Sequence, residues 1–178
     1  MNPSLGVASG TVTVVPYDSA WPSLYAAEVA RLESVLRGRG VALVFEHTGS
    51  TAVPGLAAKP VLDILAGRAS DGERGTAIDA LRAAGYLHRG EQGIAGRDFF
   101  RRGDPRAYHL HLADTASTFW RDHRRFRDYL RSHHDAMLAY AALKRTLAAQ
   151  YPTDRGAYIN GKSAFVQEIL DRTRMREE

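Results

Sequence analysis

Cysteine is absent from the 178 residues of this chain. Its absence excludes a disulfide framework, thiol catalysis and every zinc site that needs a thiolate ligand. No run approaches the roughly 20 apolar residues that a membrane-spanning helix needs. The first ten residues carry no basic segment followed by an apolar one, so we expect no secretory signal peptide. These absences predict a cytoplasmic protein with no membrane partner.

Charge of one sign is only slightly in excess. The chain has 24 Lys and Arg against 20 Asp and Glu, a formal net charge of +4. Such a balance favours an anionic partner, and it supports a nucleotide as readily as a nucleic acid. No helix-turn-helix, zinc-finger or stacking-platform pattern occurs, which argues against nucleic acid. Any metal must be held by His, carboxylate, hydroxyl or backbone oxygen.

The order of the expected elements predicts an α+β fold. Apolar residues make up 44 % of the chain, enough for one ordinary core in a single domain spanning residues 1–178. Strands dominate a sheet-containing part at about 11–114, and helices dominate a part at about 115–175. We expect residues 48–60 to form a loop or a short helix. The expected strands are 11–15, 41–47, 61–66, 97–102 and 107–113, and the expected helices are 19–38, 76–84, 118–131, 135–150 and 158–174.

Two features of the first part carry candidate chemistry. Gly49 and Ser50 follow an apolar strand, and glycine backbone, a Ser hydroxyl and free N–H groups suit an anionic phosphate. The alternative is an ordinary Gly-Ser turn in which Ser50 or Thr51 caps a helix. Asp63 lies inside an apolar strand, where a carboxylate is costly unless it is paired, hydrogen-bonded or bound to a metal. Its alternative is a strand-end carboxylate bonded to a turn.

The segment from Glu46 to Leu65, EHTGSTAVPGLAAKPVLDIL, resembles the characteristic motif of the GrpB family. Residues 108–112, 126–131 and 140–144 agree with it, as does Lys162, and the resemblance runs from about residue 14 to about residue 170. It implies a nucleotidyltransferase-like fold, a mixed β-sheet flanked by helices with a C-terminal helical region. Some relatives are fused to dephospho-CoA kinase.

The resemblance also implies roles for individual residues. Gly49 and Ser50 correspond to the phosphate loop of nucleotidyltransferases, and Asp63 to the catalytic carboxylate that holds a divalent metal. The implied cofactor is Mg²⁺, with a transition metal as the alternative, and the implied substrate is a nucleoside triphosphate. Active members of that superfamily usually carry a second carboxylate two residues later, but this chain has Leu65 there. Either other residues complete the site, or the fold binds a ligand without transferring anything.

Histidines are the candidates for completing a metal site. His109 and His111 lie two apart in an expected strand, so both point to one face while Leu110 and Leu112 point to the other. Two imidazoles on one face can ligate a metal or bind phosphate, or they form a solvated or hydrogen-bonded pair. His47 joins them as a metal ligand if the strands are neighbours. Otherwise it braces the Gly-Ser loop.

Cations are expected around the phosphates of the ligand. The candidates are Lys59, Arg97, Lys144 and Lys162, with the Thr51 hydroxyl beside Ser50. Arg offers phosphate a bidentate fork, but Arg97 is equally interpreted as a solvated charge at a strand end. Lys144 and Lys162 are alternatively surface lysines with buried stems. The arginine-rich segment 121–127 is expected to form a solvated, salt-bridged helix face, with binding of nucleic acid or an acidic partner as the alternative.

Three functions follow from these residues. The first is a metal-dependent nucleotidyltransferase or phosphoryl-transfer enzyme that takes a nucleotide or another small phosphorylated ligand. The second is a non-catalytic nucleotide-binding or accessory module, and the third a hydrolase with His and Asp around a metal. Dephospho-CoA kinase activity itself is not expected of this chain, and the name attached to some relatives does not carry over to it.

Overall fold

A computed structural model describes residues 5–175. Its elements are α1 (Trp21–Arg37), β1 (Val44–Thr48), the short 3₁₀ helix η1 (Ser50–Ala52), β2 (Leu62–Arg68), η2 (Asp71–Glu73), α2 (Arg74–Ala83), β3 (Leu87–His88), β4 (Asp98–Arg102), β5 (Tyr108–Asp114), α3 (Thr118–Ser132), α4 (His134–Gln150) and α5 (Arg155–Arg174). Within these residues no helix is long and apolar enough to cross a membrane.

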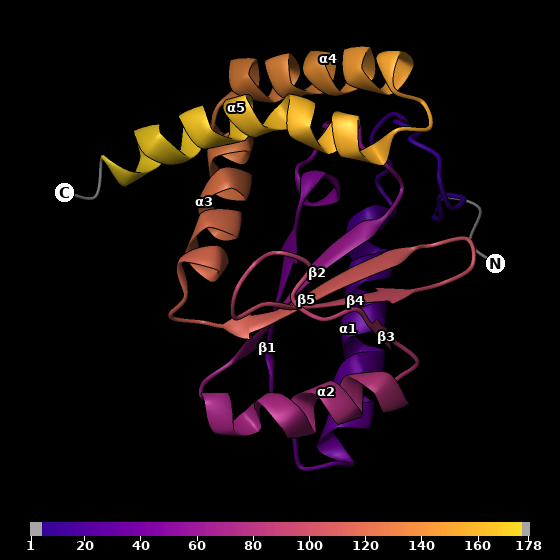
Figure 1. Ribbon diagram of the computed structural model, residues 1–178, viewed down its shortest axis with the longest axis vertical. Helices are drawn as coiled ribbons and strands as arrows, with labels where there is room; N and C mark the ends of the chain where they lie inside the picture. Colours follow the sequence, from indigo (N-terminus) through magenta and orange to yellow (C-terminus); the bar gives the residue numbers. More distant parts are fainter. Residues whose placement is uncertain (1–4, 176–178) are drawn as a thin grey trace.

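The strands form one mixed sheet in the order β1-β2-β5-β4-β3. Strands β2 and β5 pair in parallel at its centre, and the other neighbours are antiparallel. Helices α1 and α2 pack against one face, whereas α3, α4 and α5 gather on the other side (Figure 1). This arrangement confirms the expected α+β class, a mixed sheet flanked by helices with a helical C-terminal part.

Alternation along the two central strands separates the core from the site. Ile64 on β2 and Leu110 and Leu112 on β5 are fully buried in the core cluster that α1 and α2 cover. Successive strand residues point to opposite faces, so Asp63 and the odd-numbered residues of β5 point toward α3–α5. The polar side chains of these strands are therefore presented to the C-terminal helices.

The expected strand at 11–15 is wrong. Its only β-type contact is an isolated bridge between Val15 and Ala58, and the N–H of Val12 donates to the carbonyl of Pro152. Val12 is buried against Leu147 and Tyr158 of the C-terminal helices. The β-branched residues of this segment thus bury themselves between helices rather than in the sheet. Strand β3 was not expected, because its two residues are too few to show an alternating pattern.

Helix α3 differs at one position from the expected solvated, salt-bridged arginine face. Arg127 is buried, and its Nη1 donates to Glu46 Oε2 at 2.6 Å and to the carbonyl of His47 at 2.9 Å. The remaining arginines follow the expectation. For example, Arg125 pairs with Asp122 at 3.4 Å one turn away. The buried guanidinium fixes α3 against β1, next to the Gly-Ser loop.

Candidate functional site

The centre of the candidate site is a carboxylate between two histidines. The parallel register places Asp63 of β2 beside His109 of β5. Asp63 Oδ1 lies 3.0 Å from His109 Nδ1 and 3.7 Å from His111 Nε2. The ring of Phe99 on β4 lies 5.1 Å from the His109 ring and 5.2 Å from the His111 ring. The structure therefore brings these predicted residues together on the face that points to α3–α5.

The charge state of this trio follows from its contacts. Burial by itself raises the pKa of the Asp63 carboxyl, but hydrogen bonds and charge from His109 and His111 outweigh burial and hold that pKa well below its usual range. Burial lowers the pKa of His109, and Asp63 offsets only part of that effect. Because a carboxylate only accepts, His109 Nδ1 carries the shared proton. Within the described part of the chain, His109 Nε2 has no hydrogen-bond partner.

Gly49 lets the loop after β1 pass directly against this carboxylate. Its φ is +69°, which side chains rarely adopt, and an added Cβ would lie 2.5 Å from Asp63 Oδ2. Glycine is therefore required at this position for both conformation and space. The sequence predicted that Gly49 lets a ligand approach the backbone closely. In the structure the group that lies close to Gly49 is the carboxylate of Asp63.

Ser50 is paired with a buried lysine from α4. Lys144 Nζ donates to Ser50 Oγ at 2.9 Å and to the carbonyl of Ala57 at 2.5 Å. Only 2 % of Lys144 is exposed. Burial, with repulsion from Lys162, Lys59 and Arg145, lowers the pKa of the Lys144 ammonium to about 6. Lys144, which the alternative placed at the surface, is thus a buried amine in contact with Ser50.

His47 and Thr51 lie apart from the carboxylate. His47 is opposite Ile64 in the β1–β2 register, so it points to the α1 face of the sheet. There it stacks on Tyr25 at 4.5 Å, and its Nε2 lies 3.1 Å from the Thr51 hydroxyl. Burial lowers the pKa of His47 to about 4, with further lowering by Arg131 and Arg127, although the charge of Asp63 opposes it. The structure does not bring His47 to Asp63, and it matches the alternative in which His47 braces the loop.

Lys59 and Lys162 flank a single aromatic ring. Lys59 Nζ lies 5.2 Å and Lys162 Nζ 4.7 Å from the ring centroid of Tyr158 on α5. Burial lowers the pKa of Lys59 to about 8, with further lowering by Lys162 and Arg155, although Asp63 opposes it. Two cations held against one ring and close to each other leave strong positive charge at this point.

Arginines from three elements extend this charge. Burial and the neighbouring Arg155 and Arg101 lower the pKa of Arg106 to about 10. Among residues 5–175, Arg106 Nε and Nη2 are buried without a hydrogen-bond partner, as are the Nε atoms of Arg101 and Arg155. Sequence reasoning missed Arg106 and Arg155 as site residues, because nothing local to a turn residue or a helix start shows which distant groups it meets.

Arg97 lies at a different part of the same face. Its guanidinium lies 5.2 Å from the ring of Phe99 and 5.7 Å from that of Phe119 on α3, and Nη2 donates to the carbonyls of Glu91 and Gln92. The guanidinium of Arg101 also lies over the Phe99 ring, 5.4 Å from its centroid. Both arginines share the Phe99 face, as strand periodicity predicts, but backbone carbonyls already engage Arg97.

The donor set does not fit the expected Mg²⁺. Across the described chain no three His, Cys, Asp or Glu side chains form a group that could hold a metal ion. The Asp63 trio offers one carboxylate and two imidazoles, whereas Mg²⁺ prefers a shell of oxygen ligands. We therefore derive no step through a magnesium ion. Imidazole and carboxylate are the donor types of transition metals, and that cofactor stays a prediction.

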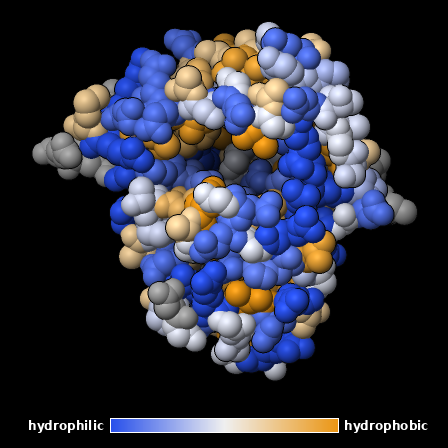
Figure 2. Space-filling model, viewed as in Figure 1, coloured by the Kyte–Doolittle hydropathy of each residue, from blue (hydrophilic) through white to orange (hydrophobic). Residues whose placement is uncertain are grey.

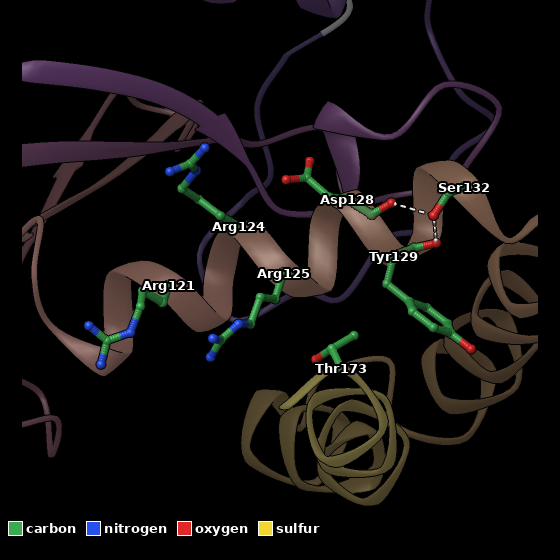
Figure 3. A pocket seen from close by; sticks show the side chains of 7 residues that line it. All are labelled: Arg121, Arg124, Arg125, Asp128, Tyr129, Ser132 and Thr173. Carbon is green, nitrogen blue, oxygen red and sulfur yellow. Dashed lines mark hydrogen bonds between the residues drawn. The ribbon is translucent and has the colours of Figure 1, made fainter. Parts of the chain in front are cut away.

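The surface is hollowed between α5 and the sheet, on the side to which the site residues point (Figure 2). A second hollow lies between α3 and α5 and is lined by Arg121, Arg124, Arg125, Asp128, Tyr129, Ser132 and Thr173 (Figure 3). Its arginines are already engaged. For example, Arg124 Nε lies 3.4 Å from Glu46 Oε1, and Arg121 Nη1 donates to the carbonyl of Ala116. Arg101, Arg106 and Arg155, whose Nε atoms have no hydrogen-bond partner in the described chain, are not among the lining residues of this second hollow.

Comparison with known proteins gives consistent matches. The family model described as GrpB protein matches residues 11–172. UPF0157 protein YqkA of Bacillus subtilis is 36 % identical over 157 residues, which are 88 % of this chain and 45 % of YqkA, so the chain spans less than half of that relative. Glutamate-rich protein GrpB of Alkalihalophilus pseudofirmus is 35 % identical over 174 residues, with 94 % of this chain and 98 % of that protein covered.

A solved structure and one enzyme are also similar. The crystal structure of conserved protein GrpB from Enterococcus faecalis matches with a TM-score of 0.82 and 31 % identity, covering 93 % of this chain and 99 % of that one. A dephospho-CoA kinase of Mycolicibacterium paratuberculosis is 29 % identical over 192 residues, but only 47 % of that protein is covered. Residues 156–163, Gly-Ala-Tyr-Ile-Asn-Gly-Lys-Ser, match the Gly-x4-Gly-Lys-Ser pattern of phosphate-binding loops, but they lie inside helix α5 and not in a loop between a strand and a helix. Sequence, fold and comparisons agree that the chain belongs to the GrpB family.

Proposed function

We propose that this protein binds a small phosphorylated ligand, with a nucleoside triphosphate as the first candidate, in the hollow between α5 and the sheet. One observation carries the proposal. Side chains from four segments bring positive charge together near a single carboxylate, that of Asp63, and the amine of Lys144 lies beside them. The cations are Lys59, Arg101, Arg106, Arg155 and Lys162.

Repulsion among these cations in the free protein favours the binding of an anion. Burial and neighbouring cations lower the pKa of Lys59, Arg106 and Lys144, which means that the positive forms are destabilised in the free protein. A polyphosphate placed among them relieves that repulsion and supplies acceptors for the unpartnered Arg nitrogens. Binding is therefore expected to draw protons onto the lysines.

Binding without nucleotidyl transfer is the form of this function that the site favours. Leu65 stands where an active nucleotidyltransferase has its second carboxylate, and it is fully buried. A two-metal mechanism needs several anionic ligands around its cations, and Asp63 alone does not supply them. Metal-dependent nucleotidyl transfer and the His/Asp hydrolase are the alternatives. The position of His47 on the other face of the sheet weakens the hydrolase.

Isothermal titration with the four common nucleoside triphosphates, with and without Mg²⁺, tests the proposal. We expect saturable binding to at least one of them. Arg106→Ala and Lys162→Ala should each weaken it by about 10- to 100-fold, since each removes a charged hydrogen-bond donor worth about 1.5–3 kcal/mol. Arg82→Ala is the matched control, because Arg82 is an exposed residue of α2. No heat of binding with any nucleotide, on folded protein, refutes the proposal.

A further inference from the structure

Ser50 and Lys144 form a pair that ligand binding alone does not require. Ser50 is the first residue of η1 and is partly exposed, whereas Lys144 is almost completely buried behind it. The 2.9 Å between Ser50 Oγ and Lys144 Nζ is a direct hydrogen bond. A second bond, from Nζ to the carbonyl of Ala57, holds the amine in place.

Charged and titratable groups from several elements surround Lys144. Lys162 of α5, Lys59 before β2 and Arg145 of α4 all disfavour the ammonium, whereas Asp63 of β2 favours it. The Lys144 amine also lies 4.7 Å from the ring centroid of Tyr140, one turn earlier on α4. Burial and three cations against one carboxylate favour the neutral amine, whose lone pair can accept the Ser50 proton.

The surroundings of Ser50 also suit a phosphoserine at this position. A phosphoserine carries about −1.5 to −2 charges at neutral pH and three acceptor oxygens. Lys59 and Lys162 lie close enough to Lys144 to shift its pKa, and Arg106 and Arg155 lie close enough to Lys59 to shift its pKa. A phosphoryl group on Ser50 would therefore be formed near these cations, two of which, Arg106 and Arg155, have side-chain nitrogens without a hydrogen-bond partner in the described part of the chain.

We propose that Ser50 is a nucleophile that takes a phosphoryl group from a bound nucleoside triphosphate, with Lys144 as its general base. This proposal rests on the proposed function, since it uses the same bound ligand. Ser50 Oγ attacks the γ-phosphorus and forms an O–P bond. The bond from that phosphorus to the bridging oxygen breaks, and the nucleoside diphosphate leaves with the electron pair. The proton of the Ser50 hydroxyl moves to Lys144 Nζ.

The experiment incubates the full chain with ATP and Mg²⁺ and measures intact mass, followed by peptide mapping. We expect the mass increment of one phosphoryl group, located on Ser50 and absent from the exposed Ser163. The increment should disappear in Ser50→Ala. The rate should rise with pH and then level off as Lys144 becomes neutral. Because the bound anion favours the ammonium form, this rise should occur at a higher pH than the pKa of Lys144 in the protein without ligand.

Lys144→Arg separates a general base from a structural brace. Arginine keeps the positive charge and the donors but cannot take up a proton at these pH values. We expect at least a 100-fold slower phosphorylation in this variant, with ATP affinity in titration changed less than tenfold. Arg82→Ala should behave as the parent chain.

The outcomes separate the two proposals. ATP binding without any phosphoryl group on Ser50 overturns the nucleophile and leaves the proposed function standing. Phosphorylation of Ser50 at an equal rate in Lys144→Arg overturns the general base. Absence of binding to all four nucleoside triphosphates overturns both. Ser50 and Ser163 are compared within the parent chain, so the main result does not depend on the folding of any variant.

Discussion

Replacement of Lys144 by Met should change how the stability of the protein depends on pH. The pKa of Lys144 falls from the ordinary 10.5 to about 6 in the folded protein. Between these two values the unfolded chain holds a proton on Lys144 that the folded chain has lost. The unfolded state therefore binds one more proton, and the free energy of unfolding rises with pH.

The size of this effect follows from the two pKa values. One proton corresponds to about 1.4 kcal/mol per pH unit, or about 6 kcal/mol over the whole interval from pH 6 to pH 10.5. Between pH 7 and pH 9 the parent chain should gain about 2.7 kcal/mol relative to Lys144→Met. The hydrogen bonds that Met cannot make to Ser50 and Ala57 add an offset that does not depend on pH, so the slope is the informative quantity.

Urea unfolding at pH 6.5, 7.5 and 8.5 measures this slope for the parent chain, Lys144→Met and the control Arg82→Met. Groups that titrate in this range without interacting with Lys144 contribute equally to all three proteins and cancel in the differences. A difference between parent and Lys144→Met that stays constant from pH 6.5 to pH 8.5 would refute the reasoning. It would mean that the buried lysine is an ammonium in the folded state, and it would remove the general base from Ser50.

Two further predictions concern the carboxylate. Gly49→Ala should lower the free energy of unfolding by about 2–4 kcal/mol in urea, because its Cβ would meet Asp63 Oδ2 at 2.5 Å in addition to the strain of a positive φ. Gly85→Ala is the control with a positive φ and open space, and an equal loss in both variants would contradict the steric argument. Millimolar Mg²⁺ without nucleotide should leave the melting temperature unchanged, because one carboxylate offers it too few oxygens; a saturable rise that Asp63→Asn abolishes would show that magnesium binds there.

Strand periodicity predicted the central part of the candidate site. The spacing of His109 and His111 placed both on one face, and the apolar context of Asp63 marked it as a carboxylate with partners. Both inferences depend only on local alternation, which is set by backbone geometry. The α+β class was predictable for the same reason, since the order of strands and helices is written along the chain.

The predictions that failed are those that depend on how distant segments of the chain pack together. A register shift of one residue decides whether His47 or Thr48 lies beside Asp63, and no local pattern fixes that register. The cations Arg106 and Arg155 lie far apart in sequence, and they meet only because α5 returns across the sheet (Figure 1). Lys144 was ambiguous in sequence because a long side chain on a helix is equally suited to the surface and to a buried contact.

The positive charge of the hollow is divided between two layers of the molecule. Lys59 and Arg106 belong to the loops of the sheet, whereas Arg155 and Lys162 belong to α5. An anion that contacts both pairs works as a removable crosslink between the sheet and the last helix. The ligand is then part of what holds the C-terminal helix in place, and the stability of that helix depends on how much ligand is present.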